Sequence, residues 1–297
     1  KEITEFGELK DVGAVGLSDD GHTVMNADTF RRALEYAKMF DLPIISHCED
    51  TNLSAGGVMN EGKTSTILGL MGLPSVSEDI IVGRDVRLAE FTQGRIHIAH
   101  VSTIASVDII RQAKKRGVKV SAEATPHHFT LTEEAVGEYN TCAKMNPPLR
   151  TRRDVDALLA GLADGTIDIL ASDHAPHTDF EKEQEFNFAP FGIIGLETLL
   201  PLVMTQLVQP GVISLMEAVR KMTVNPARVL GLDKGVLEEG VDADITIIDP
   251  EMELTYRRDM VGSKSHNSPF FGWTLKGWAV GTIVDGRAVM RNRELLA

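Results

Sequence analysis

The sequence has little of what marks several specialised classes of protein. Its 297 residues include two cysteines, Cys48 and Cys142, which are too few for a disulfide framework and fit a reducing compartment. No apolar run approaches the roughly 18 to 20 residues of a membrane span, and the start carries no signal-peptide pattern. The formal net charge is -13, and the sequence contains no cluster of Lys and Arg residues that would make a locally positive surface. We therefore expect neither nucleic acid nor an anionic membrane as a partner. These absences predict a cytoplasmic protein.

The composition is that of a chain able to bury a large core. Hydrophobic residues make up 43%, charged residues 25% and aromatic residues 5%, which is ordinary for a globular fold and excludes general disorder. Because the average surface is negative, an anionic substrate would need a locally positive site such as a metal ion.

Short β-branched runs alternate with amphipathic helical patterns, as is typical of βα units around a parallel sheet. The predicted strands cover residues 12–17, 43–46, 95–100, 118–123 and 167–171. The predicted helices cover residues 26–40, 75–92, 102–115 and 152–162. In the first helix Asn26 is the expected N-cap, and the expected buried face consists of Phe30, Ala33, Leu34 and Ala37.

Five such units cannot close an eight-stranded (β/α)₈ TIM-type barrel, so we expect on the order of 100 further residues upstream, three units' worth. The chain also begins with Lys1 rather than Met. From about Lys234 the pattern changes to short strands at 243–248, 278–284 and 287–290. We therefore predict a partial barrel over 1–233 and a small β-sandwich domain over 234–297.

Acidic residues and histidines follow the predicted strands. They are Asp19 and Asp20, His47, His100, His127 and His128, and finally Asp173, His174 and His177. Barrel enzymes place their active sites at the carboxyl ends of their strands, where such side chains converge. Imidazole and carboxylate ligands suit zinc or a related divalent ion. The sequence therefore predicts a hydrolytic metal site.

Several motifs make this prediction more specific. They are Ser18-Asp19-Asp20-Gly21, Ser46-His47-Cys48-Glu49, His97-Ile98-Ala99-His100-Val101-Ser102, Ala124-Thr125-Pro126-His127-His128, Lys144-Met145-Asn146-Pro147-Pro148-Leu149-Arg150 and Ala171-Ser172-Asp173-His174-Ala175-Pro176-His177. In order and content they resemble those of bacterial class I dihydroorotases of the amidohydrolase superfamily. The resemblance covers nearly the whole chain.

The resemblance implies a barrel with a binuclear zinc centre, of which strands four to eight are present here. His47 and His100 would bind one zinc ion, Asp20 would bridge the two ions, and Asp173 would bind the other. Asp173 would also be the catalytic residue that carries the proton between water and the leaving nitrogen.

The implied reaction is the reversible cyclisation of N-carbamoyl-L-aspartate to (S)-dihydroorotate in de novo pyrimidine (UMP) biosynthesis. Asn146, His177 and the backbone groups of Phe191 and Gly192 would hold the substrate. A homodimer and an associated aspartate transcarbamoylase are possible partners under this interpretation.

Other polar residues receive structural interpretations. His97 and Asp19 alternate with the candidate ligands along their strands and point away from them. His127, His128 and His174 are expected to support turns or the site rather than bind metal. Arg150 and Arg152 are interpreted as exposed residues at a helix start, and the acidic run after Asp179 as a solvated face.

One departure from the family is large. Its first two zinc ligands and a substrate-binding arginine belong to a His-x-His-x-Arg motif on the first barrel strand, and this sequence has no such motif. We expect a truncated chain. The alternatives are a non-catalytic subunit of an aspartate transcarbamoylase complex or another cyclic amidase, such as allantoinase or dihydropyrimidinase.

Overall fold

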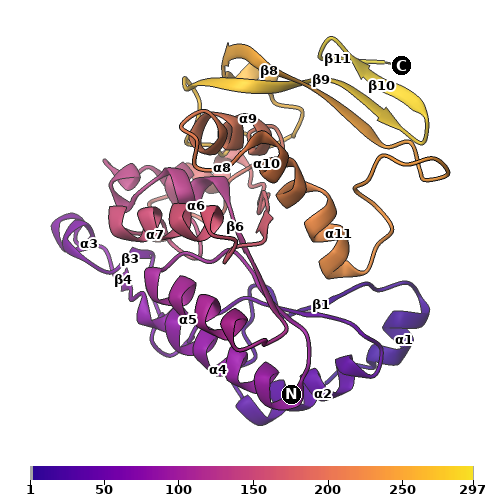
Figure 1. Ribbon diagram of the computed structural model, residues 1–297. Helices are drawn as coiled ribbons and strands as arrows, with labels where there is room; N and C mark the ends of the chain where they lie inside the picture. Colours follow the sequence, from indigo (N-terminus) through magenta and orange to yellow (C-terminus); the bar gives the residue numbers. More distant parts are fainter. Residues whose placement is uncertain (1–2, 297) are drawn as a thin grey trace.

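A five-stranded parallel sheet organises the larger part of the computed structural model, which describes residues 3–296 (Figure 1). The strand order is β1-β2-β5-β6-β7, so successive strands of the sheet are neighbours in space. The strands are β1 (Leu17–Ser18), β2 (Ile44–Ser46), β5 (Ile96–Ile98), β6 (Val120–Ala124) and β7 (Ile169–Leu170). All five carboxyl ends therefore meet at one edge, as the sequence predicted.

Helices connect these strands and bury one face each against the sheet. They are α2 (Ala27–Lys38), α4 (Val76–Thr92), α5 (Ile104–Lys115) and α7 (Arg152–Ala163). The prediction for α2 is confirmed: Asn26 caps it by accepting a bond from the Thr29 amide at 2.9 Å. Its buried residues are the four expected, Phe30, Ala33, Leu34 and Ala37.

The predicted strand at 12–17 is wrong in position. Helix α1 (Phe6–Asp11) occupies the preceding residues, and the chain after it is irregular as far as β1. Val12 is 83% exposed and Gly13 has a φ of +99°, a conformation that strands do not use. The apolar run at Val12, Ala14 and Val15 therefore marks a connection to β1.

Several further elements were not predicted. Between β2 and α4 lie β3 (Met59–Asn60), α3 (Lys63–Leu68) and β4 (Gly72–Leu73), and between β6 and β7 lie α6 (Pro126–Thr130), η1 (Glu133–Val136) and η2 (Thr141–Ala143). After β7 come α8 (Asp179–Lys182), α9 (Leu199–Val203), the π-helical η3 (Met204–Val208), α10 (Leu215–Met222) and α11 (Val224–Leu230). No described helix is both long and apolar enough to cross a membrane.

The C-terminal segment forms one four-stranded antiparallel sheet of order β11-β10-β9-β8, drawn in orange to yellow in Figure 1. Its elements are β8 (Ile245–Thr255), η4 (Arg258–Met260), β9 (Thr274–Val284), β10 (Arg287–Arg291) and β11 (Glu294–Leu295). A second hydrophobic cluster joins this sheet to the barrel part, since Trp278 and Tyr256 pack with Leu131 and Leu202. The proposed domain limits at 233 and 234 stay a prediction.

Candidate functional site

Three side chains that follow successive strands of the sheet converge on one point. Asp20, His47 and His100 each offer a ligand atom, and these atoms lie within 4.8 Å of one another. His47 Nδ1 is 2.9 Å from His100 Nε2, and Asp20 Oδ1 is 3.4 Å from the former and 3.7 Å from the latter. Two imidazoles and a carboxylate make a donor set that suits zinc. This is a candidate metal site.

The backbone near this point is strained at two of the candidate residues. His100 has a φ of +33° and Asp173 a φ of +47°, in the left-handed region that few non-glycine residues adopt. Each residue follows the end of a parallel strand, β5 and β7 respectively. Strain of this kind costs about 1–3 kcal/mol and gathers at functional sites. It therefore sets these two positions apart from ordinary strand ends.

The neighbours of His47 fix its ring. Nε2 lies 2.9 Å from Glu49 Oε2, so Nδ1 is the nitrogen that faces Asp20 and His100. Burial lowers the pKa of His47, but its bonds with Asp20 and Glu49 outweigh burial and raise the pKa to about 9. Hydrogen bonds from His100 and His47 in turn lower the pKa of Asp20, whose side chain is 64% exposed.

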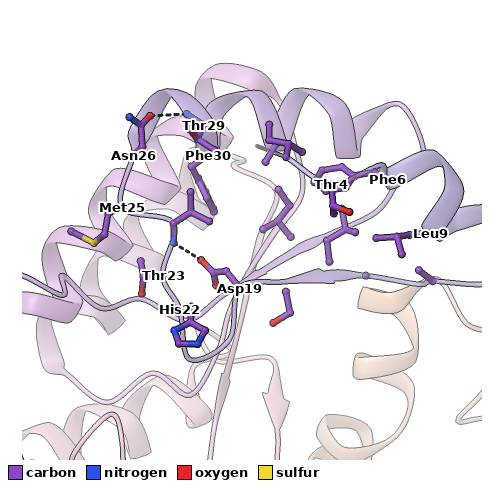
Figure 2. A pocket seen from close by; sticks show the side chains of 18 of the residues that line it. Thr4, Phe6, Leu9, Asp19, His22, Thr23, Met25, Asn26, Thr29 and Phe30 are labelled. Carbon is purple, nitrogen blue, oxygen red and sulfur yellow. Dashed lines mark hydrogen bonds between the residues drawn. The ribbon is translucent and has the colours of Figure 1, made fainter. Parts of the chain in front are cut away.

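Asp19 points away from this group, as its alternation with Asp20 predicted. Its Oδ1 accepts a hydrogen bond from the His47 amide at 2.8 Å and its Oδ2 one from the Val24 amide at 3.0 Å. Figure 2 shows the second of these bonds beside Thr23 and His22. Asp19 thus ties the end of β1 to His47, the residue that follows β2.

Asp173 lies outside the group of three and faces His127. Its Oδ2 is 3.8 Å from His127 Nε2, and within the described residues neither atom has a hydrogen-bond partner although both are buried. Burial raises the pKa of Asp173, and this outweighs the opposite effect of His100. Unpaired buried polar atoms are costly, so a pair of them beside a candidate metal group suggests that a ligand is held here.

The remaining histidines of these motifs have protein partners. His97 lies 2.8 Å from Ser121 Oγ and 3.0 Å from Glu123 Oε2. His128 lies 2.7 Å from Thr125 Oγ1 and 2.8 Å from the Pro147 carbonyl. Both rings are therefore held by structural contacts. The sequence could not show that His128 has protein partners while His127 Nε2 has none among the described residues, because this depends on how the short helix α6 is rotated.

The candidate substrate-binding residues lie around the same edge. Asn146 Nδ2 donates to Glu49 Oε2 at 2.9 Å, which connects Asn146 to His47 through one carboxylate oxygen. His177 Nε2 lies 2.7 Å from the Phe191 carbonyl. The Gly192 amide donates to the Lys144 carbonyl at 2.9 Å, so a ligand that used this amide would have to displace that bond.

Gly192 must be glycine here. Its φ is +145°, and a Cβ atom at this position would lie 2.8 Å from the Ala175 carbonyl oxygen and 2.9 Å from His177 Cδ2. Asn267 holds the same region from the C-terminal segment: its Nδ2 donates to the Ala175 and Gly192 carbonyls, and its Oδ1 accepts from the His177 amide at 3.1 Å. The motif Asn267-Ser268-Pro269-Phe270 fits the β domain of the family that the sequence resembles, but nothing in the sequence indicated that Asn267 reaches the site.

Two buried lysines hold the loop that joins His177 to Phe191. Lys144 Nζ donates to the carbonyls of Phe186 at 2.6 Å, Asn187 at 3.2 Å and Ala189 at 2.7 Å. Lys182 Nζ donates to the Thr141 and Pro190 carbonyls at 2.9 and 2.8 Å. Burial lowers the pKa of both lysines to about 8. The loop therefore has a fixed shape although its acidic residues face solvent.

The interpretation of Arg150 as an exposed residue is wrong. It is 3% exposed and donates to Ser102 Oγ at 3.1 Å, Asn60 Oδ1 at 2.9 Å and the Leu73 carbonyl at 2.8 Å. Its NH2 group lies 3.9 Å from the buried Glu78, whose Oε1 accepts from the Ser102 amide at 3.0 Å. The network holds the turn that follows His100.

Replacing Arg150 by methionine is expected to lower the free energy of unfolding by about 3–5 kcal/mol, because it leaves the buried Glu78 carboxylate without its cation. Arg152→Met is the matched control, since Arg152 is exposed at the start of α7 and should change stability by less than about 0.5 kcal/mol. Urea unfolding measures both. Equal stability of the two variants would contradict the role of Arg150.

A separate cavity lies between α1, β1 and α2 (Figure 2). Its volume is about 870 Å³, and apolar side chains such as Phe6, Leu9, Leu17 and Phe30 supply much of its lining. Asp20, His47 and His100 do not line it. The candidate site is therefore located by the strand ends and not by this cavity.

Comparisons with known proteins identify the family of this chain. The model of the amidohydrolase family matches residues 1–289. A dihydroorotase of Pelotomaculum thermopropionicum is 58% identical over 295 residues, 99% of this chain and 69% of the relative. A dihydroorotase of Acetivibrio thermocellus is 55% identical over 296 residues, 100% of this chain and 70% of the relative.

Solved structures give the same fold. The L-hydantoinase (dihydropyrimidinase) of Arthrobacter aurescens superposes with a TM-score of 0.88 at 27% identity, covering 99% of this chain and 68% of that one. A D-hydantoinase of Thermus sp. superposes with a TM-score of 0.84 at 24% identity, covering 100% and 69%. The expected barrel fold is thus confirmed. The chain belongs to the amidohydrolase family and, within it, to the dihydroorotase family.

Proposed function

We propose that this chain carries out the dihydroorotase reaction, the reversible cyclisation of N-carbamoyl-L-aspartate to (S)-dihydroorotate in pyrimidine biosynthesis. The observation that carries the proposal is 58% identity to a curated dihydroorotase across 99% of the chain. The convergence of Asp20, His47 and His100 supports it, because hydrolysis of an amide at neutral pH needs an activated carbonyl.

The donor set favours zinc. Asp20, His47 and His100 would hold one ion, and Asp20 together with Asp173 would contact a second. The unpaired buried atoms Asp173 Oδ2 and His127 Nε2 support a ligand at this place. A bound divalent ion polarises the carbonyl and makes water a better nucleophile.

Asp173 is the proposed proton carrier. In the hydrolytic direction it accepts a proton from the attacking water and passes it to the ring nitrogen that leaves; cyclisation runs the same transfer in reverse. The Asp173 Oδ2 atom is free of other hydrogen bonds within the described residues, so it can form one with the reacting groups.

Asn146, His177 and the backbone of Phe191 and Gly192 are the proposed substrate contacts. The clamp formed by Lys144 and Asn267 supports this assignment, because it fixes the segment from His177 to Gly192 before any ligand arrives. The cytoplasmic location, the homodimer and the association with an aspartate transcarbamoylase stay predictions.

Two other functions fit part of the observations. The first is a cyclic amidase of another specificity, because the hydantoinase and dihydropyrimidinase structures share the fold at 22–27% identity. The dihydroorotases are more similar, at 53–58% identity, and this favours dihydroorotate as the substrate. The second alternative is a non-catalytic subunit of an aspartate transcarbamoylase complex. The intact Asp20, His47, His100 and Asp173 favour the enzyme.

Hydrolysis of dihydroorotate by the zinc-loaded product of the complete reading frame that contains this chain is the experiment that distinguishes these functions. Allantoin and dihydrouracil are run in parallel. We expect turnover of dihydroorotate alone. Turnover of a control compound instead would change the substrate, and no turnover of any compound would favour the non-catalytic subunit.

A further inference from the structure

Glu49 lies between the candidate metal group and a candidate substrate residue, since it contacts both His47 and Asn146, and the resemblance described in the sequence analysis assigned it no role. One of its oxygens, Oε2, is 2.9 Å from His47 Nε2 and 2.9 Å from Asn146 Nδ2. Its side chain is 18% exposed, so water screens these contacts only in part. The Glu49 amide donates to Thr23 Oγ1 at 3.2 Å, which also fixes the backbone that carries the carboxylate.

The first contact decides which nitrogen of His47 can bind a cation. A carboxylate only accepts hydrogen bonds, so Nε2 must carry the proton when His47 is neutral. The lone pair then lies on Nδ1, the atom that faces His100 Nε2 at 2.9 Å and Asp20 Oδ1 at 3.4 Å. A carboxylate behind a metal-binding imidazole orients the ring and strengthens it as a ligand.

The second contact decides how Asn146 faces the site. Only the amide nitrogen can donate to Glu49, so the bond assigns Nδ2 to the Glu49 side. The Asn146 oxygen and its second N–H are left for other partners. They are one acceptor and one donor, the two kinds of group that pair with the N–H and C=O of a cyclic amide or ureide.

We propose that Glu49 is a positioning residue that couples the two halves of the site, holding His47 in the metal-binding tautomer and Asn146 in the substrate-binding orientation with a single oxygen. The proposal rests on the proposed function for its substrate half only. Replacement of Glu49 should therefore weaken the binding of both metal and substrate, although under this proposal Glu49 contacts only His47 and Asn146 and neither the metal nor the substrate.

The test uses Glu49→Ala, Glu49→Gln and the exposed control Glu183→Ala in the complete protein. Zinc affinity is measured by competition with a chelator, and kcat and KM by hydrolysis of the amide that the unaltered protein prefers. In Glu49→Ala the zinc dissociation constant should rise about 10- to 100-fold. KM should rise about 10-fold, because Asn146 without its charged partner is no longer held in the substrate-binding orientation and must be ordered when the substrate binds.

Glu49→Gln separates position from charge. Its amide oxygen can accept from both His47 and Asn146, so KM should return to within about threefold of the unaltered protein while zinc affinity recovers only in part. In a double-mutant cycle, Asn146→Ala should raise KM less in the Glu49→Ala background than alone, because that background has already released the amide.

The two proposals fail differently. If the unaltered protein hydrolyses a cyclic amide while Glu49→Ala keeps its zinc affinity and KM and loses only thermal stability, Glu49 is merely structural and the inference is overturned. If the unaltered protein hydrolyses none, the proposed function fails. The zinc titration then still decides the contact with His47: unchanged affinity in Glu49→Ala overturns the coupling, and weakened affinity supports it.

Discussion

Replacing Asp173 by asparagine is expected to lower kcat by about 10²- to 10⁴-fold, the range that a positioned general acid–base contributes. The amide has the shape of the carboxyl group but cannot take a proton from water and return it to nitrogen. Burial raises the pKa of Asp173, because it disfavours the charged form of the carboxyl group, so replacement by a neutral group of the same shape adds no desolvation cost. The loss should therefore appear in turnover rather than in folding.

Asparagine is the correct replacement because of the backbone. Asp173 has a φ of +47°, and Asn is one of the few residues that adopt this region readily, whereas alanine would add strain to the loss of the carboxylate. Asp156→Asn is the matched control, since Asp156 is exposed on α7. Steady-state kinetics and a thermal melt on both variants make the measurement. Turnover near that of the unaltered enzyme would remove Asp173 from the reaction.

The sequence predicted the parallel layer well because its signals are local. Each βα unit carries its own apolar run and amphipathic helix, and in α2 the cap at Asn26 and the spacing of Phe30 and Leu34 determine both the start and the buried face. The topology then followed from general rules, because short connections place consecutive parallel strands side by side. Strand-end residues distant in sequence were thereby predicted to meet.

The wrong predictions concern segments whose conformation or burial depends on contacts with residues distant in the sequence. The run at Val12 has the composition of a strand, but pairing with β2 begins only at Leu17. Arg150 follows two prolines and precedes a helix, a place where arginine is commonly exposed, and only the packing of Asn60 and Glu78 against it explains its burial. Residues 199–230 form helices that the pattern did not mark.

The candidate site was predictable as a set but not in its connections. That Asp20, His47 and His100 share one point follows from strand ends at one edge. The contacts of one Glu49 oxygen with both His47 and Asn146 could not be predicted in this way, because they depend on the position of a loop almost 100 residues away in the sequence. Side chains that bind are thus easier to find from sequence than the side chains that orient them.

Removing the carboxylate of Asp20 is expected to weaken zinc binding by at least about 100-fold, since losing a group that only orients a ligand already costs about 10- to 100-fold. Asp20 Oδ1 lies 3.4 Å from His47 Nδ1 and 3.7 Å from His100 Nε2. Its negative charge attracts a cation at this point, and the two imidazole rings carry no negative charge that could replace it. Asp20→Ala should lower metal content and turnover together.

Stability separates this effect from misfolding. The Asp20 side chain is 64% exposed, so its contacts with His47 and His100 are screened by water, and its removal should lower the free energy of unfolding of the metal-free protein by no more than about 1 kcal/mol. Asp19→Ala should behave in the opposite way, because it breaks the bonds to the His47 and Val24 amides and destabilises the strand ends. Metal analysis and urea unfolding of both variants decide: full zinc content in Asp20→Ala would mean that Asp20 is not a ligand, and the metal site would then have to rest on His47, His100 and Asp173.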